Sequence, residues 1–469
     1  MMNQIFLRNN ATRFGLGGCA LRWTTGQAPR DEPAVLSKMQ NERVTWPEKD
    51  NLWRVKRLRR DRKVRLATIF PAVVALMLAA GAAVMPARAQ VVEIDFWSLF
   101  TGGDGQIMNE IVARFNEEHP NIKVTHTILD WGDPYYSKLI TSTVAGAPPA
   151  VGVMHSSRIQ SFIEQGLLTA LTEKDLELMG ISSNDFMPNI WERGLYEGRV
   201  YAIPLDVHPY ALYMNVPMFE QAGLAVRSPQ GEAELLQYVR SLTIDRDGDG
   251  IAEVSGFAGY GSREWLGYLY QYGGRIMDEQ GMPAFRTDAG RRALEIQREV
   301  IRAASDRIFG WFGDQSAAMQ LLGPWEIGNF TRLEIDFKTD VAPQVGPYPG
   351  TWAESHLLIV PRGVREQNPE VFEAALTFIS WLSLNTIEWS AGAGHVPARI
   401  DRLTVDSFLA LEHQQAFARS LEFSYFWPDH RLEGEFHGQG IWPYLNDEFD
   451  VNEALTRLEQ AFRNVMFEP

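Results

Sequence analysis

The chain has 469 residues, of which 44 are Lys or Arg and 59 are Asp or Glu, and its formal net charge is −15. Residues 1–89 hold 16 of the basic and 6 of the acidic residues, which leaves 28 and 53 for residues 90–469. Residues 90–469, the body of the chain, are therefore strongly acidic and repel nucleic acid and anionic membrane surfaces. This charge argues against both as partners. The single cysteine, Cys19, lies in the basic part, so residues 90–469 hold no disulfide and no thiol chemistry.

Residues 54–89 carry the pattern of a secretory signal peptide. Residues 54–65 include eight basic residues and one acidic residue, and residues 66–85 carry no charge. Small residues then occupy both key positions of the triplet Ala87-Arg88-Ala89, as at a cleavage site. We therefore expect cleavage after Ala89 and a periplasmic protein. The alternative is a membrane anchor, because an apolar run of about 20 residues is long enough to span a bilayer.

The remaining parts of the chain are an N-terminal extension and a long body. Residues 1–53 lack hydrophobic periodicity, which predicts disorder. A start codon assigned too far upstream, or an extension removed with the signal, would account for them. Residues 90–469 are long enough for two domains with a large hydrophobic core, and an exported protein of this size without disulfides suggests a bacterial periplasm.

The body begins with alternating strand and helix patterns. Strands are predicted at 91–97, 121–129 and 150–156, a turn at 101–105, and helices at 105–120, 135–146, 158–166, 368–383 and 452–466. Alternation of this kind predicts a mostly parallel sheet with helices on its faces, hence an α/β fold. Ligands of such sheets bind beyond the carboxyl ends of the strands, which points to the loops at 98–105 and 155–158.

Nine segments between about residue 91 and residue 469 together resemble the family 1 extracellular solute-binding proteins of ABC transporters. In chain order they include FNEEHPNIKV, YYSKLITSTVAGAPPAV, YEGRVYAIPLDVHPYALYMNVPMFEQAGL, DRDGDG, YQYGGRIMDEQG, SAAMQLLGPWEIGNF, LLIVPRG and GHVPAR. The resemblance implies a two-lobed periplasmic-binding-protein fold (type II), with hinge-linked lobes and a ligand cleft between them. It places chain crossings near Pro209, Pro343 and Arg399. Lobe 1 would then be 90–209 plus 344–400, and lobe 2 would be 210–343 plus 401–469.

The same resemblance implies a monomeric protein that captures a carbohydrate and delivers it to the membrane permease subunits of an ABC transporter. It would catalyse no reaction. A glycerol-phosphate or uronate binder of the same fold is the first alternative. A secreted carbohydrate-active enzyme is the second, although the sequence has no G-x-S-x-G, no H-E-x-x-H and no phosphate-binding loop.

Four tryptophans are candidate ligand contacts, because an indole ring stacks on the C–H face of a sugar. Trp325 matches the Gly-Pro-Trp segment of the family, in which the tryptophan commonly stacks on the ligand. By similarity, Trp265 and Trp352 lie in loops that face the cleft. Trp97 ends the first strand and either lines the cleft or supports it. Core packing is the alternative for each of them, since tryptophan usually buries most of its area.

Seven polar residues are candidate hydrogen-bonding partners of the ligand. They lie in the first and third strand-to-helix turns, beside the first hinge and near Trp265: Asp104, His155, Ser157, Arg158, Asp206, His208 and Arg263. Helix capping or surface solvation is the alternative, above all for Asp104 and Ser157. His155 and His208 stand where the family often has acidic or small residues. With Arg158 and Arg263 they would suit an anionic ligand, but the number of aromatic residues favours a neutral oligosaccharide.

The segment DRDGDGIAE is a candidate calcium loop. Asp245, Asp247 and Asp249 stand at positions 1, 3 and 5 of such a loop, but position 12, which needs a bidentate Glu, is Gly256. A tight acidic turn is the alternative, since Asp and Gly favour turns. We therefore expect at most a weak structural calcium site and no required cofactor.

Overall fold

The computed structural model describes residues 90–304 and 310–467. The predicted extension (1–53) and signal peptide (54–89), with its cleavage site after Ala89, lie outside the described residues. Within the described part of the chain, no helix has both the length and the apolar character that a membrane span needs.

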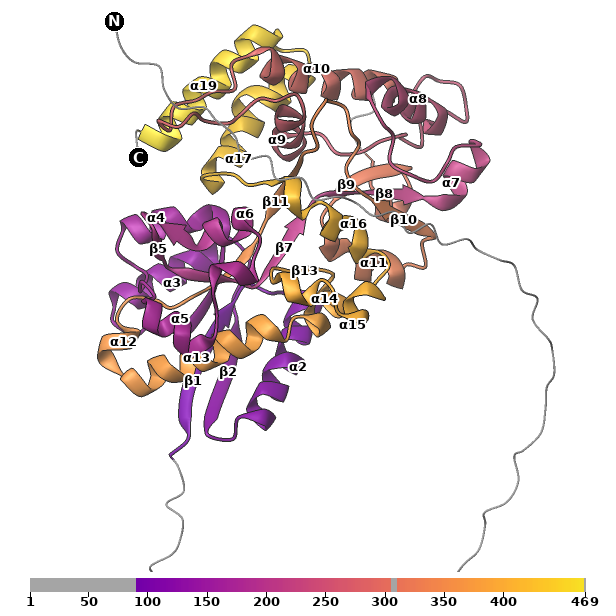
Figure 1. Cartoon of the computed structure of the whole chain (residues 1–469). Coiled ribbons are helices and arrows are strands. Elements are labelled where there is room, and N and C mark those ends of the chain that lie inside the picture. Colours follow the sequence, from indigo (N-terminus) through magenta and orange to yellow (C-terminus); the bar gives the residue numbers. More distant parts are fainter. Residues whose placement is uncertain (1–89, 305–309, 468–469) are drawn as a thin grey trace, which may run out of the picture. The chain divides into compact units, whose positions relative to one another are not determined.

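A five-stranded sheet with the order β2-β1-β3-β12-β6 organises the first part of the body (Figure 1). Its strands are β1 (Val92–Ser98), β2 (Ile122–Ile128), β3 (Val151–His155), β6 (Ala202–Pro204) and β12 (His356–Ile359). Strand β1 is parallel to β2 and β3, as the alternating pattern predicts, whereas β12 is antiparallel to β3 and β6. The carboxyl ends of β1, β2 and β3 therefore meet at one edge of the sheet.

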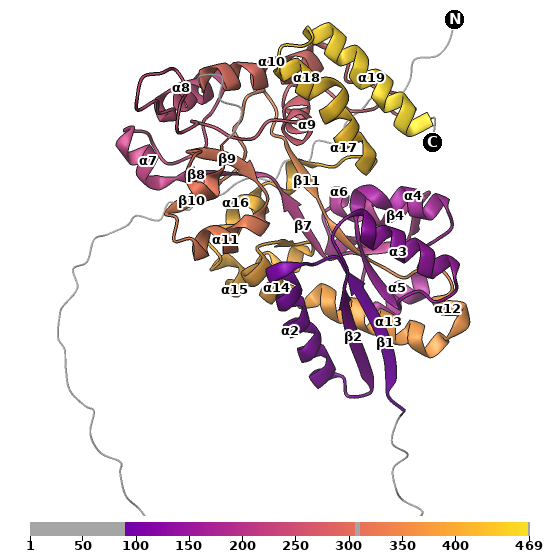
Figure 2. The same ribbon diagram turned by 180° about the vertical axis from the view of Figure 1, so that it is seen from behind.

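Helices on this sheet bury one face each. In α2 (Gly102–Glu118) the buried residues Met108, Ile111, Val112 and Phe115 recur with helical spacing. Seen from behind, α2 lies beside β2 (Figure 2). The predicted turn at 101–105 is instead the first turn of this helix. Gly105 allows the helix to begin there, because a Cβ at that position would collide with the carbonyl oxygen of Phe100.

The first hydrophobic core lies around the five-stranded sheet and its helices. Its helices are α2, α3 (Asp133–Val144), α4 (Ile159–Glu164), α5 (Glu173–Met179), α6 (Pro188–Trp191), α11 (Ile327–Arg332), α12 (Val364–Gln367), α13 (Pro369–Leu384), α14 (Ile387–Ala393), α15 (Asp406–Leu409) and α16 (Gln414–Arg419). A short hairpin, β4 (Leu195–Tyr196) with β5 (Arg199–Val200), lies before β6.

The second hydrophobic core is built mainly by helices. They are α7 (Val216–Gln221), α8 (Glu232–Leu242), α9 (Ser262–Gln271), α10 (Asp288–Ala303), α17 (His430–Phe436), α18 (Trp442–Leu445) and α19 (Val451–Phe467). An antiparallel sheet of β8 (Ala211–Asn215), β9 (Met319–Leu322) and β10 (Phe337–Asp340) lies between the two cores. Successive residues of β8 alternate between them, since Tyr213 packs in the first core and Leu212 in the second.

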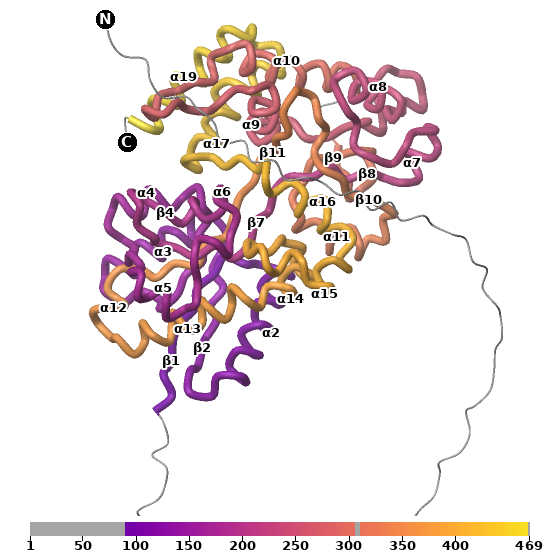
Figure 3. Tube along the Cα trace, viewed as in Figure 1, coloured from indigo at the N-terminus to yellow at the C-terminus, as the bar shows by residue number. Residues whose placement is uncertain are grey.

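Short strands connect the two sheets. Strand β7 (Asp206–Pro209) leads from β6 to β8, and β11 (Thr351–Glu354) leads back into β12. They form a four-stranded sheet in the order β13-β7-β11-β14, with β13 (Val396–Pro397) and β14 (Ser424–Tyr425). The tube in Figure 3 follows the chain through β7 and β11. Pro209 thus lies in a connecting strand, while the lobe boundaries given above stay a prediction.

Candidate ligand-binding cleft

A cleft of about 530 Å³ opens beyond the carboxyl ends of β1, β2 and β3. Segments from both hydrophobic cores line it, including the loops after these three strands and the helices α9 and α17. The lining residues are Leu99, Phe100, Thr101, Asp104, Trp131, Gly132, Tyr136, His155, Ser157, Arg158, His208, Arg263, Trp325, Trp352, Glu354, His356, His395, His430 and Glu433.

Most of the residues proposed from the sequence meet in this cleft. The residues that line it are Asp104, His155, Ser157, Arg158, His208, Arg263, Trp325 and Trp352. The first four were found because ligands bind beyond the carboxyl ends of parallel strands: Asp104 follows β1, His155 ends β3, and Ser157 and Arg158 follow it. Their role as ligand-binding residues stays a prediction.

Trp265 does not face the cleft, contrary to the expectation from the sequence. It lies in α9, is 0% exposed and packs edge-on against Phe285 and Phe436. Its indole N–H donates to the carbonyl oxygen of Gly290 at 3.3 Å. Residues two apart on a helix point to nearly opposite sides. Because Arg263 faces the cleft, Trp265 is directed into the core.

Trp97 and Asp206 also lie outside the lining. Trp97 alternates with the buried residues Phe96 and Ser98 of β1, and the ammonium group of Lys138 lies 5.7 Å from its ring centroid. Trp97 therefore supports the sheet and does not line the cleft. Asp206 is 0% exposed and contacts the lining residues His208 and His356 from behind.

Three tryptophans line the cleft in different ways. Trp131 is 64% exposed, and its ring lies edge-on to His155 with centroids 6.1 Å apart. Trp325 is half-buried and edge-on to His208 at 5.8 Å. Trp352 is buried against Tyr210, and the guanidinium carbon of Arg263 lies 4.2 Å from its ring centroid. Trp131 and Trp325 therefore offer ring surface to a ligand, whereas Trp352 mainly supports Arg263.

The position of Trp325 depends on the glycine two residues before it. A Cβ on Gly323 would collide with the six-membered ring of Trp325. The short 3₁₀ turn Pro324–Glu326 folds the indole back over this glycine. The Gly-Pro-Trp segment thus fixes the ring at the wall of the cleft.

Both arginines of the cleft already have acidic partners. Arg158 contacts Asp133 at 2.8 Å, and Arg263 contacts Glu433 at 2.8 Å. Arg263 also donates to the hydroxyl oxygen of Tyr210 at 2.9 Å. Three carboxylates, Asp104, Glu354 and Glu433, stand among the lining residues beside these two arginines. The arginine charges are therefore compensated before any ligand arrives.

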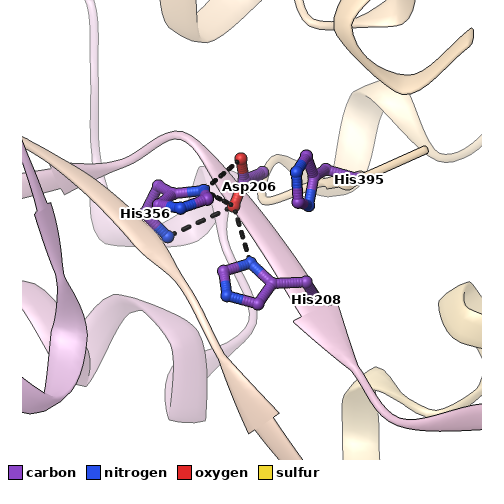
Figure 4. Close-up of side chains that lie close together, drawn as sticks. All are labelled: Asp206, His208, His356 and His395. Atoms are coloured by element: carbon purple, nitrogen blue, oxygen red, sulfur yellow. Dashed lines mark hydrogen bonds and ion pairs between the residues drawn. The ribbon is translucent and has the colours of Figure 1, made fainter. Parts of the chain in front are cut away.

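A buried group of histidines surrounds Asp206 at the base of the cleft (Figure 4). The Asp206 carboxylate contacts Nδ1 of His356 at 2.9 Å and Nδ1 of His208 at 3.3 Å, and it accepts a hydrogen bond from the indole N–H of Trp389 at 2.7 Å. Burial alone would raise the pKa of Asp206, but the charges and hydrogen bonds of His356, His395 and His208 outweigh burial and hold the pKa well below its usual value.

Burial controls the charge of the other histidines. It lowers the pKa of His208 to about 3, although Asp206 opposes the shift. Burial, together with the neighbouring His356 and His208, holds the pKa of His155 well below its usual value. For His395 burial disfavours the charged form, but the carboxylates of Asp206 and Asp104 outweigh it and raise the pKa. His155 and His208 are thus neutral at pH 7.

Among the lining residues that sequence reasoning did not name, seven lie outside the predicted loop 98–105 and have an aromatic or titratable side chain: Trp131, Tyr136, Glu354, His356, His395, His430 and Glu433. The loop after β2 contributes Trp131, and the first turn of the following helix, α3, contributes Tyr136. Looking beyond the carboxyl end of β2, as for β1 and β3, would have found both. Glu354 and His356 come from β11 and β12, about 150 residues beyond Asp206 in the chain. No local pattern indicates that pairing.

The acidic loop forms a compact turn. Carboxylate oxygens of Asp245, Asp247 and Glu253 lie within 4.8 Å of one another, whereas Asp249 is not in this group. Backbone N–H groups of Gly248 and Gly250 donate to Asp245 at 2.7 and 3.0 Å. The donor set suits calcium, but the loop also closes on its own backbone. A weak calcium site there stays a prediction.

The sequence matches the family described as bacterial extracellular solute-binding protein over residues 101–386. It is 22% identical over 208 residues to a Brucella abortus (strain 2308) protein named as a binding protein, which is 43% of this chain and 48% of that protein. It is 26% identical over 161 residues to the sn-glycerol-3-phosphate-binding periplasmic protein UgpB of Pectobacterium atrosepticum, 31% of this chain and 34% of that protein. The chain thus spans about half the length of the first curated relatives that it matches.

Solved structures share the fold. The ABC substrate-binding protein Lmo0181 of Listeria monocytogenes, in complex with cycloalternan, superposes with a TM-score of 0.69 at 18% identity, covering 80% of this chain and 99% of that chain. UgpB of Mycobacterium tuberculosis, in complex with glycerophosphocholine, gives 0.68 at 20% identity, covering 80% and 98%. The fold is thus the predicted two-lobed α/β periplasmic-binding-protein fold.

Proposed function

Because this chain belongs to the bacterial extracellular solute-binding proteins, we propose that it captures a neutral carbohydrate and delivers it to the permease subunits of an ABC transporter. The proposal includes export by the signal at 54–89, a periplasmic location, a monomeric state and no catalysed reaction. Sugar-binding structures of the same fold support it, such as the one with cycloalternan.

The cleft combines exposed aromatic rings with polar groups, and this combination suits a sugar ligand. Trp131 and Trp325 present ring surface, and hydroxyl-binding groups such as Asp104, Ser157 and Glu354 stand beside them. A cavity of about 530 Å³ lies in the size range of ligand sites. A pyranose needs both kinds of contact, because it has an apolar C–H face and a rim of hydroxyl groups.

The charges favour a neutral ligand over an anionic one. An anion needs uncompensated positive charge, but Arg158 and Arg263 each have a carboxylate partner at 2.8 Å. Burial lowers the pKa of His155 and of His208, so neither adds positive charge at pH 7. The pairing of both arginines with carboxylates is thus the observation that favours a neutral sugar over a glycerol phosphate or a uronate.

A thermal-shift screen of the purified full-length protein tests the proposal. The panel holds neutral oligosaccharides, uronates and glycerophosphodiesters, and titration calorimetry follows each hit. A true ligand at 100 times its Kd should stabilise the fold by about 2.7 kcal/mol. Stabilisation by uronates or glycerophosphodiesters alone would favour the anionic alternative. Product release from a polysaccharide panel would indicate an enzyme.

A further inference from the structure

Three histidines and one aspartate converge at the base of the cleft, where the family match assigns no role to them. We propose that Asp206, His208, His356 and His395 bind a divalent transition-metal ion of the Zn²⁺ class. Each residue offers one ligand atom, and these four atoms lie within 4.8 Å of one another. All four side chains are buried. Figure 4 shows the three imidazole rings arranged around the carboxylate of Asp206.

The donor set has the chemistry and spacing of such an ion's ligands. Imidazole nitrogen and carboxylate oxygen are standard zinc ligands, and metal–ligand bonds near 2.0–2.2 Å place neighbouring ligand atoms of a tetrahedron roughly 3.3 Å apart. Oδ1 of Asp206 lies 3.3 Å from Nδ1 of His208 and 3.1 Å from Nδ1 of His356. Imidazoles also suit Cu²⁺ and Ni²⁺, so the class of ion is assigned and not one element.

His395 provides an independent observation. Its side chain is 2% exposed, and neither ring nitrogen has a hydrogen-bond partner among the described residues. The nearest carboxylate, of Asp104, lies 3.6 Å from Nε2, beyond hydrogen-bond length. Buried polar groups without partners are rare because they are costly. A metal ion held between His395 and Asp206 would supply the missing partner.

Surrounding contacts hold the ligands in place before any ion arrives. Asp206 and His208 are two residues apart on β7, so their side chains leave the same face of the strand. Trp389 donates to Asp206 at 2.7 Å, and the hydroxyl of Ser355 donates to the backbone oxygen of Asp206 at 2.6 Å. Such outer contacts orient metal ligands and raise affinity.

A hydrogen-bonded cluster without metal is the competing explanation. It accounts for His208 and His356, because an ionised Asp206 accepts a hydrogen bond from each ring. It leaves His395 with only the carboxylate of Asp104 at 3.6 Å from Nε2 and with no hydrogen bond at either ring nitrogen. The two explanations differ in whether the protein retains an ion.

The test loads the metal-free full-length protein with Zn²⁺, dialyses it and measures bound zinc. We expect one ion per chain, a tetrahedral Co²⁺ spectrum after exchange, and an X-ray absorption shell containing several imidazoles. The variants Asp206→Asn, His356→Gln and His395→Gln should each raise the Kd by more than about 100-fold, since outer-shell changes alone cost 10–100-fold. His413→Gln is the matched control, a half-buried histidine that packs on Phe337 away from the cleft.

Three results would overturn the proposal. They are a wild-type protein that retains no zinc, zinc that persists in all three cluster variants, and zinc that is lost with Asp247→Asn in the acidic loop. Near-ultraviolet circular dichroism verifies that each variant is folded. Should the variants unfold, the wild-type absorption shell still decides, because a shell with fewer than two imidazoles contradicts the site. None of these measurements requires a sugar, so they are independent of the proposed transport function.

Discussion

At the scale of single residues, Trp325 and Trp265 can be compared directly, because Trp325 lines the cleft and Trp265 lies in the core. We expect Trp325→Ala to weaken sugar binding by about 1–3 kcal/mol, because an aromatic surface of the cleft wall is lost. Its melting temperature without ligand should stay near the wild-type value, since the ring is half-buried at an open cleft. Trp265→Ala should instead cost about 3–5 kcal/mol of stability through a core cavity. Calorimetry and thermal melts measure the two quantities.

Two results would contradict the predicted role of Trp325 in ligand binding. An unchanged affinity with a collapsed melting temperature would show that Trp325 is a core residue. Should His155→Ala and His208→Ala abolish binding while Trp325→Ala does not, polar contacts and not ring stacking select the ligand.

Glu264 predicts a pH dependence of stability. It lies in the first turn of α9, and burial raises its pKa to about 7, although the charge of Arg263 opposes the shift. Between about pH 4.5 and pH 7 the native state therefore holds a proton that the unfolded chain has released, so this group lowers the free energy of unfolding as pH rises through that window.

Replacing this carboxyl by an amide removes the effect. We expect Glu264→Gln to be more stable than the wild type by about 1–3 kcal/mol at pH 8 and nearly equal to it at pH 4, since one pKa unit corresponds to about 1.4 kcal/mol. Urea denaturation at both pH values measures this, with the exposed Glu279→Gln as the control for losing one charge. A difference that is the same at both pH values would contradict the assignment.

At the scale of elements, the acidic loop between α8 and α9 predicts a small response to calcium. Position 12 is Gly256, so affinity should lie near the millimolar end of known sites. At 1 mM calcium and a Kd of about 1 mM, stabilisation is only about 0.4 kcal/mol. Thermal melts of the metal-free protein with and without calcium measure it, and the double variant Asp245→Asn/Asp247→Asn is the control. A shift of several degrees that the double variant lacks would show a tight site.

The success of sequence reasoning also varied by element. Strands β1 to β3 and helices α2 to α4 were predictable, because their apolar residues recur with the periods of a strand or a helix. The segment SHLLIVP at 355–361 also reads as a strand, and it contains β12. Its antiparallel pairing with β3 was not predictable, because that pairing joins His356 to His155 across about 200 residues. The pairing of β7 with β13 that helps gather the histidine group is equally remote, with Val396 opposite Val207.

At the scale of the whole molecule, the signal peptide that the sequence predicts at 54–89 can be tested directly. We expect the exported protein to begin at Gln90, because the Ala87-Arg88-Ala89 triplet closes the apolar run. N-terminal sequencing of the protein from the periplasmic fraction measures this. An intact chain in the membrane fraction would show that residues 66–85 act as an anchor.

Strand β7 has a mechanical consequence for this molecule. The same four residues that lead the chain from one sheet to the other also carry Asp206 and His208 at the base of the cleft. We predict that β7 is a hinge between the lobes, so a ligand that contacts His208 would be attached directly to this hinge. We therefore expect a substitution at His208 to change both how easily β7 bends and which ligand the cleft prefers, so the two properties should be coupled at this strand.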